Sequence, residues 1–406
     1  NEERRQRPRL TSRSLFEGIT VKPRFVLQLP SRALWSLFTG LVCAVAVYAA
    51  EPGVSAGEVV IGQNITLQGG KNRYGVAALD GIKLYFDAIN AAGGVHGRKL
   101  VLRTADDDNA SSTAEANARK LLAEGAFVLF ASQEGGPSTA VAKVAEELRV
   151  PFFGPMAGSP NLRRPHSPMV FPVRAEHRDE FRALMEWGQR TGLKTVGLFH
   201  ADSDVGRAHL ENVKITAAEL GLGVALTLLP QNARDLNLQL DAMAGQIAAT
   251  QPDMVINHGS AGAYARLIAK ARKTRIKTTF MAVNSGSTQL AADLGPLAHG
   301  MVFAQVVPSP WERKHAISRE FQEAMAKSRP GVALSYGGLE GFLTAKALVM
   351  ALQATGKNLT RPSFVSALEH SNFDLGGMTV RYSNQSHDGS RFVDLSMYSR
   401  DDRFIH

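Results

Sequence analysis

Cysteine is almost absent from this chain: Cys43 is the only one among 406 residues. A single cysteine excludes an intramolecular disulfide and a zinc cluster built from cysteines. Long hydrophobic runs are scarce too: the uncharged apolar stretch at residues 34–50 has 17 residues, and a spanning helix needs about 20. A strong charge bias is also missing, because five of the nine net positive charges lie in the first 50 residues. We therefore expect no nucleic-acid partner.

The remaining composition is that of a globular protein. Hydrophobic residues make up 44% and charged residues 20%, which excludes a collagen-like, coiled-coil or wholly disordered chain. At roughly 100–200 residues per domain, the length predicts two or three domains.

Residues 1–50 are interpreted as an N-terminal extension with a signal peptide. Arg24 and Arg32 precede the apolar stretch LWSLFTGLVCAVAVYAA, which ends in small residues. A basic segment, a short apolar segment and a small-residue exit are typical of a cleavable secretory signal. The alternative is a retained membrane anchor. Lipid attachment at Cys43 is disfavoured, because Val42 stands where a small residue is needed. We expect cleavage near Ala49 or Ala50.

The body of the chain alternates predicted strands and helices, and does so twice. Strands are expected at 59–65, 100–102, 127–130, 151–154, 195–200, 224–229, 254–257, 279–283, 301–307, 378–382 and 392–398. Helices are expected at 79–89, from a capping Ser111 or Ser112 to 122, and at 137–148, 179–190, 206–220, 236–249, 264–272, 318–327 and 335–354. Strands joined by helices predict an α/β fold with two doubly wound parallel-sheet lobes. Ligands of such sheets bind outside the carboxyl ends of the strands.

Catalytic and metal-binding motifs are missing. No glycine-rich dinucleotide motif follows a strand. The segment HGSAG resembles the nucleophile turn of hydrolases, but His258 stands where that motif needs glycine. The acidic run at 106–108 departs from calcium-loop spacing at Ala110. We therefore expect no enzyme, no cofactor and no metal, with a hydrolase as a disfavoured alternative.

Several segments resemble a known family. DGIKLYFDAINAAGGVHGRKLVLRTADDDN, and above all residues 87–99 within it, is similar to the start of periplasmic binding proteins for branched-chain amino acids, the leucine-binding-protein-like substrate-binding subunits of ABC importers. The resemblance continues through GPMAGSPNLR (154–163), HADSDVGRAHL (200–210), QVVPSPW (305–311) and SYGGLEGF (335–342). It covers nearly all of residues 57–400.

The resemblance implies a type I periplasmic binding fold, in which three crossovers join two lobes and ligand binds between them by hinge closure. We place the crossovers near residues 173–175, 306–308 and 375–381. Lobe one is then 57–174 with 308–377, and lobe two is 175–307 with 378–406. The implied function is capture of a small carboxylate-bearing solute in the periplasm by a monomer that delivers it to a membrane permease. A ligand sensor on the same fold is the alternative.

The resemblance also implies ligand contacts in lobe one. An aromatic residue of the first strand–helix loop covers the ligand in the family, and Tyr74 fits this position, although it could instead only pack between the lobes. The loop after the third strand, which opens a helix, is suited to the ligand carboxylate through its backbone N–H groups. The expected contacts from this loop and the next one are Gln133, Gly135, Gly136, Ser138, Thr139, Met156, Gly158 and Ser159.

Lobe two departs from the family pattern at one point. Its expected contacts are Asp204, Val205, Ser260, Asn284 and Ser285. Amino-acid binders carry a glutamate in the loop aligned with residues 283–286, where it pairs the ligand ammonium, whereas this loop reads VNSG. A neutral loop offers no charge-assisted partner. Either Asp204 or Glu340 replaces the glutamate, or the ligand lacks an amine and is an aromatic or aliphatic carboxylate or an amide. Unless one of these two acids reaches the ligand, we expect a carboxylate without an α-amine to bind at least as well as the matching branched-chain or hydrophobic amino acid. Glu340 could also be an ordinary surface or capping carboxylate.

Overall fold

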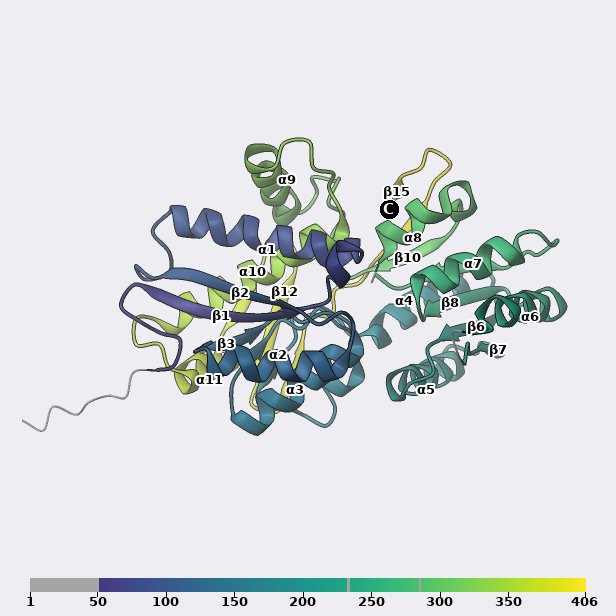
Figure 1. The fold of residues 1–406 in the computed structure, drawn as a ribbon. Helices are drawn as coiled ribbons and strands as arrows, with labels where there is room; N and C mark the ends of the chain where they lie inside the picture. The colour runs from purple at the N-terminus through teal and green to yellow at the C-terminus, as the bar shows by residue number, and fades with distance from the viewer. Residues whose placement is uncertain (1–50, 232–233, 285) are drawn as a thin grey trace, which may run out of the picture. The chain divides into compact units, whose positions relative to one another are not determined.

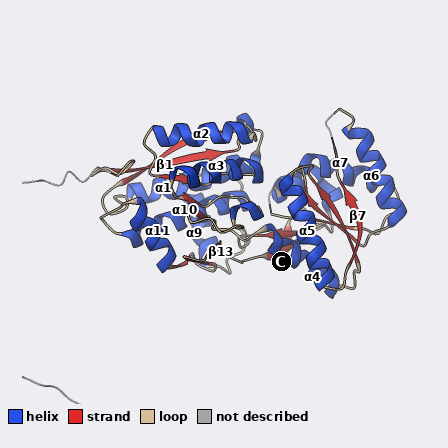
Figure 2. Ribbon diagram, turned by 90° about the horizontal axis from the view of Figure 1, so that it is seen from below, coloured by secondary structure: helices blue, strands red, loops and turns tan. Residues whose placement is uncertain are grey.

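The computed structural model describes residues 51–231, 234–284 and 286–406 (Figure 1). The predicted signal segment and Cys43 lie outside the described residues. Helices flank the sheets in both lobes (Figure 2). The α/β fold expected from the alternation is confirmed, and its strands form two mainly parallel sheets and one small antiparallel sheet.

The sheet of lobe one is parallel throughout, in the order β2-β1-β3-β4-β5. Its strands are β1 (Glu58–Ile65), β2 (Lys99–Asp106), β3 (Val128–Phe130), β4 (Phe152–Phe153) and β5 (Val170–Phe171). Successive side chains of a strand point to opposite faces. Accordingly, Phe152 and Phe153 enter two different hydrophobic clusters, and both faces of the sheet are covered.

Helices cover the two faces of this sheet. One face carries α1 (Arg73–Ala91), α9 (Ala316–Ser328), α10 (Tyr336–Thr355) and α11 (Arg361–His370). The other carries α2 (Ser111–Ala123) and α3 (Gly135–Leu148). Helices α1 and α10 approach so closely that a Cβ on Gly81 would lie 2.0 Å from the Gly338 carbonyl oxygen.

The sheet of lobe two runs β15-β14-β10-β9-β8-β6-β7, with β14 and β15 antiparallel. Its strands are β6 (Thr195–His200), β7 (Gly223–Leu228), β8 (Met254–His258), β9 (Thr279–Ala282), β10 (Val302–Gln305), β14 (Asp394–Tyr398) and β15 (Phe404–Ile405). One face carries α4 (His177–Arg190) and α5 (Asp204–Glu219). The other carries α6 (Leu236–Thr250), α7 (Ala261–Ala271) and α8 (Ser287–Leu294).

The third crossover lies later than predicted. The small sheet contains β11 (Asn372–Asp374), β12 (Thr379–Ser383) and β13 (Ser386–Gly389). Val380 and Tyr382 of β12 belong to the core of lobe one, and the Tyr382 hydroxyl donates to the Pro172 carbonyl oxygen at 2.9 Å. The chain therefore enters lobe two after β13, near residues 390–393, because the β12 side chains complete the lobe-one core.

The predicted serine cap of α2 is also wrong. Helix α2 begins at Ser111 with Ala110 as its N-cap, and no side chain in the described structure caps it. Asn72, Ser203 and Ser260 do cap α1, α5 and α7 through their side-chain oxygens. Short 3₁₀ turns complete the fold at Gln68–Gly70, Pro160–Leu162 and Gly295–Ala298. Among the described helices, none is both long and apolar enough to cross a membrane.

Candidate functional site

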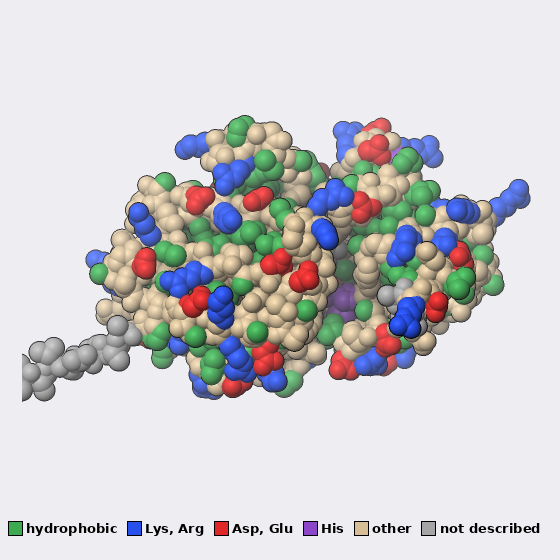
Figure 3. Space-filling view, in the orientation of Figure 1, with side chains coloured by type: hydrophobic (Ala, Val, Ile, Leu, Met, Phe, Trp, Pro, Cys, Tyr) green, Lys and Arg blue, Asp and Glu red, His purple; other side chains and the backbone are tan. Residues whose placement is uncertain are grey.

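A cavity of about 870 Å³ lies between the carboxyl ends of strands from both lobes. Lobe one contributes residues 109, 111 and 112 after β2 and residues 134–137, 139 and 140 at the start of α3. Lobe two contributes residues 201 and 203–206 after β6 and residues 258–260 after β8. Figure 3 shows the hollow between the lobes, with a histidine side chain visible inside it. The volume falls in the range of about 300–1,000 Å³ that is usual for small-molecule sites.

Four helix N-termini open onto this cavity, those of α2, α3, α5 and α7. Ser203 and Ser260 cap α5 and α7 by accepting from Gly206 N and Ala263 N. Helices α2 and α3 have no side-chain cap from the described residues. Their ends lie together, since a Cβ on Gly136 would come within 2.9 Å of the Ser111 hydroxyl oxygen. Lobe one therefore presents two uncapped, partly positive helix ends to the cavity.

Glu134 adds a carboxyl group beside the N-terminus of α3. It precedes α3 with φ +64°, a backbone region that non-glycine residues seldom adopt, and its side chain does not cap the helix. Its carboxyl group lines the cavity and has no hydrogen-bond or ion-pair partner among the residues that the structure describes. Burial raises the pKa of Glu134, the Asp107 carboxyl adds to that rise, and the Arg174 guanidinium opposes it.

Behind the cavity wall, lobe one buries polar atoms that lack partners in the described structure: Gln133 Oε1, Ser138 Oγ and Ser159 Oγ. Such atoms are unusual inside proteins, because each one loses its hydrogen bonds to water. The Thr139 hydroxyl, by contrast, donates to the Gly135 carbonyl oxygen at 2.7 Å. Thr139 therefore supports its own helix.

Tyr74, Asn284 and Glu340 join the lobes through hydrogen bonds. Asn284 Nδ2 donates to Glu340 Oε2 at 2.7 Å and to Tyr74 Oη at 3.1 Å, and the Tyr74 hydroxyl also donates to Glu340 Oε2. Asn284 N donates to Glu180 Oε2 at 2.7 Å. These side chains bond to one another within the protein and do not line the large cavity, while Asn284 Oδ1 and Glu340 Oε1 have no hydrogen-bond partner in the described structure.

Arg174 neutralises the two buried glutamates of this network. Its Nη2 atom lies 2.5 Å from Glu180 Oε1, and its Nη1 atom lies 3.6 Å from Glu340 Oε1. The arginine and glutamate side chains are at most 2% exposed. Burial raises the pKa of both glutamates, and the guanidinium opposes that rise. Because Arg174 lies in the first crossover and Glu340 in α10, this ion-pair group belongs to the hinge region.

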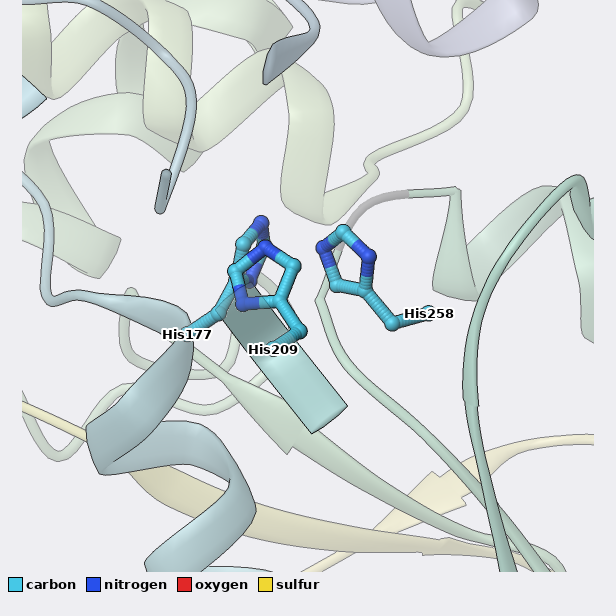
Figure 4. A group of neighbouring side chains, drawn as sticks. All are labelled: His177, His209 and His258. Carbon is cyan, nitrogen blue, oxygen red and sulfur yellow. The ribbon is translucent and has the colours of Figure 1, made fainter. Parts of the chain in front are cut away.

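Three histidines of lobe two meet beside the network. His177 begins α4, His209 lies in α5 and His258 ends β8, and one ring nitrogen of each lies within 4.8 Å of the others (Figure 4). His258 also lines the cavity. Burial lowers the pKa of all three rings. Arg174 and Arg163 lower the pKa of His177 further, the neighbouring histidines lower that of His209 and His258, and the Glu180 carboxylate opposes the lowering at His258. Of the described residues, these are the group suited to hold a metal ion.

The residues expected from the sequence fall into four groups. Those lining the large cavity are Gly135, Gly136, Thr139, Asp204, Val205 and Ser260. Those buried behind its wall are Gln133, Ser138, Met156, Gly158 and Ser159. Asn284, Glu340 and Tyr74 form the network, and Tyr74 also lines a smaller cavity of about 160 Å³. Ser285 lies outside the described residues.

Neither of the two carboxylates expected to pair a ligand amine is free in the structure. The Asp204 side chain is 91% exposed and pairs with Arg207, and Glu340 is already bonded within the protein. The sequence did not single out Glu134, although it lies in the loop expected to hold the carboxylate. It also did not single out Arg174, Glu180 and the three histidines. Of these, Arg174 lies in the predicted first crossover, His209 in the segment at 200–210 and His258 in the segment HGSAG.

A two-lobed α/β protein with three crossovers and a cavity at the strand ends of both lobes is a hinged ligand-binding protein. The sequence model of the periplasmic binding protein family matches residues 58–399. The chain therefore belongs to this family, whose fold and ABC-transporter type were expected from the sequence. Members are substrate-binding proteins of transporters.

Solved structures agree with the fold. An extracellular ligand-binding receptor from Verminephrobacter eiseniae is 24% identical, with TM-score 0.78 over 86% of this chain and all of its own. A branched-chain amino acid ABC transporter protein from Thermus thermophilus with bound valine is 19% identical, with TM-score 0.74 over 86% and 95%. A solute-binding protein from R. palustris in complex with benzoate is 18% identical, with the same TM-score and coverage. No curated protein matches the sequence.

Proposed function

We propose that this protein captures a small carboxylate-bearing solute, an α-amino acid in the first place, in the cavity between its lobes and delivers it to the permease of an ABC importer. The observation that carries the proposal is the pairing, on one cavity wall, of two uncapped helix ends with the free carboxyl group of Glu134.

The carboxylate is assigned to the ends of α2 and α3. The first N–H groups of a helix have no partner within it, and the helix dipole adds partial positive charge there. Gly135 and Gly136 carry such groups, and with no side chain they let a ligand oxygen come close. The Ser111 hydroxyl beside Gly136 can donate to the same oxygen.

The amine is assigned to Glu134. In an α-amino acid the ammonium stands next to the carboxylate, and Glu134 stands next to the N–H groups of α3. A charge-assisted bond to this carboxylate would offset the cost of burying the ammonium. The neutral loop at 283–286 had favoured a ligand without an amine, and Glu134 removes that reason.

The structural relatives give this chemistry indirect support. One holds valine and another holds benzoate, and both ligands carry a carboxylate whereas only valine carries an amine. A shared fold below 25% identity carries no ligand assignment by itself. The choice between the two ligand types therefore depends on Glu134.

Calorimetry with matched ligands tests the proposal. We expect wild-type protein to bind leucine at least about tenfold more tightly than 4-methyl-2-oxopentanoate, a difference of about 1.4 kcal/mol. Glu134→Gln should abolish this preference, because an amide cannot provide the negative charge. Phenylalanine and phenylpyruvate form a second matched pair.

Asp204→Asn is the matched control, since Asp204 lines the same cavity but is exposed and paired with Arg207. It should keep the preference for the amino acid. The amine assignment fails if Glu134→Gln keeps the preference or if the keto acid binds more tightly to wild type. Mass spectrometry of small molecules released from the purified protein tests the carboxylate.

Export belongs to the same proposal, because an importer subunit of this kind works in the periplasm. The apolar stretch at 34–50 would direct export and be removed. N-terminal sequencing of the exported protein should find a first residue between Ala46 and Ser55. Recovery of the intact apolar stretch would instead favour a retained anchor.

A further inference from the structure

We propose that His177, His209 and His258 bind a divalent first-row transition-metal ion, with Zn²⁺ as the best match, on the lobe-two wall of the cavity. This site goes beyond the proposed function. It uses residues of one lobe only and does not depend on which solute the cavity takes.

The three imidazoles come from separate elements and converge. His177 lies at the first residue of α4, His209 inside α5 and His258 at the last residue of β8. Ring centroids lie 3.7 Å apart for His209 and His258, 4.4 Å for His177 and His258, and 5.1 Å for His177 and His209. Figure 4 shows the rings gathered around one point. Three imidazoles around one point are a usual ligand set for zinc.

Three of the six ring nitrogens of the cluster are buried without a partner in the described structure. Both nitrogens of His209, whose side chain is fully buried, and Nδ1 of His258 are buried without a hydrogen bond. Buried histidines outside the cluster keep at least one bonded ring nitrogen: His387 pairs with the Val170 carbonyl oxygen and with Glu369, and His200 Nδ1 pairs with the Ala201 carbonyl oxygen although its Nε2 has no partner. His209 differs from both because neither of its ring nitrogens is bonded, and a metal ion would use these free lone pairs.

His177 already has the second contact that metal-bound histidines usually make. Its Nδ1 lies 2.8 Å from Glu180 Oε1, which leaves Nε2 for a metal. A carboxylate on the far nitrogen fixes the ring orientation and raises its basicity as a ligand. Glu180 is itself fixed by Arg174 and by Asn284 N, so the hinge network orients this ligand.

The surroundings favour a nitrogen-binding metal with an open position. Phe181 packs against all three rings, with centroids 5.4–6.3 Å away, and keeps one side of the cluster apolar. His258 lines the cavity, so a fourth ligand would enter from there. Zinc with three histidines and one open position takes water or a solute oxygen as its fourth ligand. Mg²⁺ and Ca²⁺ prefer oxygen ligands and should not compete.

Calorimetric titration of chelator-treated full-length protein with ZnCl₂ tests the site. We expect one equivalent of Zn²⁺ to bind, with no displacement by a 100-fold excess of MgCl₂. His209→Gln and His258→Gln should each weaken binding by at least about 100-fold. His299→Ala should leave binding unchanged, because His299 pairs with Asp402 outside the cluster. Absence of Zn²⁺ binding at micromolar concentration, or equal binding by His209→Gln, overturns the proposal.

X-ray absorption on the wild-type Zn²⁺ complex identifies the metal ligands without any histidine variant, so this test does not require the variants to fold. It should report three imidazole nitrogens at about 2.0–2.1 Å from zinc. Fewer than three imidazoles would overturn the assignment even if Zn²⁺ binds.

Separate experiments distinguish failure of the metal-site proposal from failure of the proposed function. Solute calorimetry is run in EDTA, and Zn²⁺ calorimetry is run without solute. Solute binding in EDTA together with absent Zn²⁺ binding defeats the metal site alone. One equivalent of Zn²⁺ on the histidines with no carboxylate binding defeats the proposed function alone.

Discussion

Arg174 is the residue on which the hinge charges depend. It lies between Glu180 and Glu340, and all three side chains are withdrawn from water. Taking a charge out of water is costly, and loss of one member of a buried ion pair leaves the other uncompensated. The same network holds Asn284 and Tyr74, so its loss would disturb both lobes.

Arg174→Met should lower the free energy of unfolding by about 3–5 kcal/mol at pH 7.5, because two carboxylates lose their counter-ion. Burial already raises the pKa of both glutamates, and loss of the guanidinium raises it further. A carboxyl group with a raised folded-state pKa stabilises the fold at low pH and loses that contribution as pH rises through the folded-state pKa. The penalty should therefore be smaller at pH 5, as measured by denaturant unfolding.

Arg207→Met serves as the control for Arg174→Met. Arg207 also pairs with two carboxylates, Asp202 and Asp204, but it is 59% exposed. Exposed pairs contribute about 0–1 kcal/mol. An equal loss of stability in both variants, or a penalty for Arg174→Met that does not change with pH, would contradict the role given to buried charge.

The packing of helix α1 against helix α10 depends on glycines at the interface, because they have no side chain. A Cβ on Gly81 would lie 2.0 Å from the Gly338 carbonyl oxygen, and one on Gly341 would lie 2.0 Å from the Ala78 carbonyl oxygen. Both glycines lie inside helices, where glycine normally costs stability. Their helical positions are therefore explained by the close approach of two backbones, which also places Tyr74 next to Glu340.

Gly81→Ala should reduce the free energy of unfolding by about 1–3 kcal/mol, since the helices must separate to admit a methyl group. Gly245→Ala is the matched control, because Gly245 lies in α6 with no atom within 4 Å of the added Cβ. It should raise stability by about 0.5–1 kcal/mol through helix propensity alone. Urea unfolding of both variants gives the comparison, and a stabilised Gly81→Ala would contradict the packing argument.

At the scale of the whole molecule, the cavity walls come from two lobes joined by three segments. Gly135 of lobe one faces Val205 of lobe two, where an added Cβ would lie 3.3 Å from Val205 Cγ1. A ligand that contacts both walls would favour the arrangement in which the walls are close. Closure would then present a surface to the permease only after the solute is bound.

Ligand binding should therefore stabilise and compact the protein together. At one hundred times the dissociation constant, a ligand adds about 2.7 kcal/mol to the free energy of unfolding. Thermal unfolding measures this gain, and small-angle scattering on the same samples should give a smaller radius of gyration. Tight binding without compaction would argue against closure, and D-leucine serves as a control of matched composition.

The repeating pattern of strands and helices was readable from the sequence because it depends on neighbouring residues. Strand β6 was predicted with the bounds that the structure has, and α10 within one residue at each end. Strand β4 falls inside the strand expected at 151–154, whereas β5 was missed, because two residues are too few for a period. Helix α11 was missed although Thr360 and Pro362 mark its start.

The sequence by itself determined the α/β fold, the family and several of the loops that line the cavity, since caps, glycines and apolar periods act over a few residues. Only the tertiary structure decided which side chains meet. Arg174 reaches Glu180 and Glu340, and three histidines converge from positions 177, 209 and 258. Such meetings depend on how distant helices and strands pack, and no local pattern encodes them. For the same reason, no local pattern showed that the β12 side chains pack into the lobe-one core, which places the third crossover after β13.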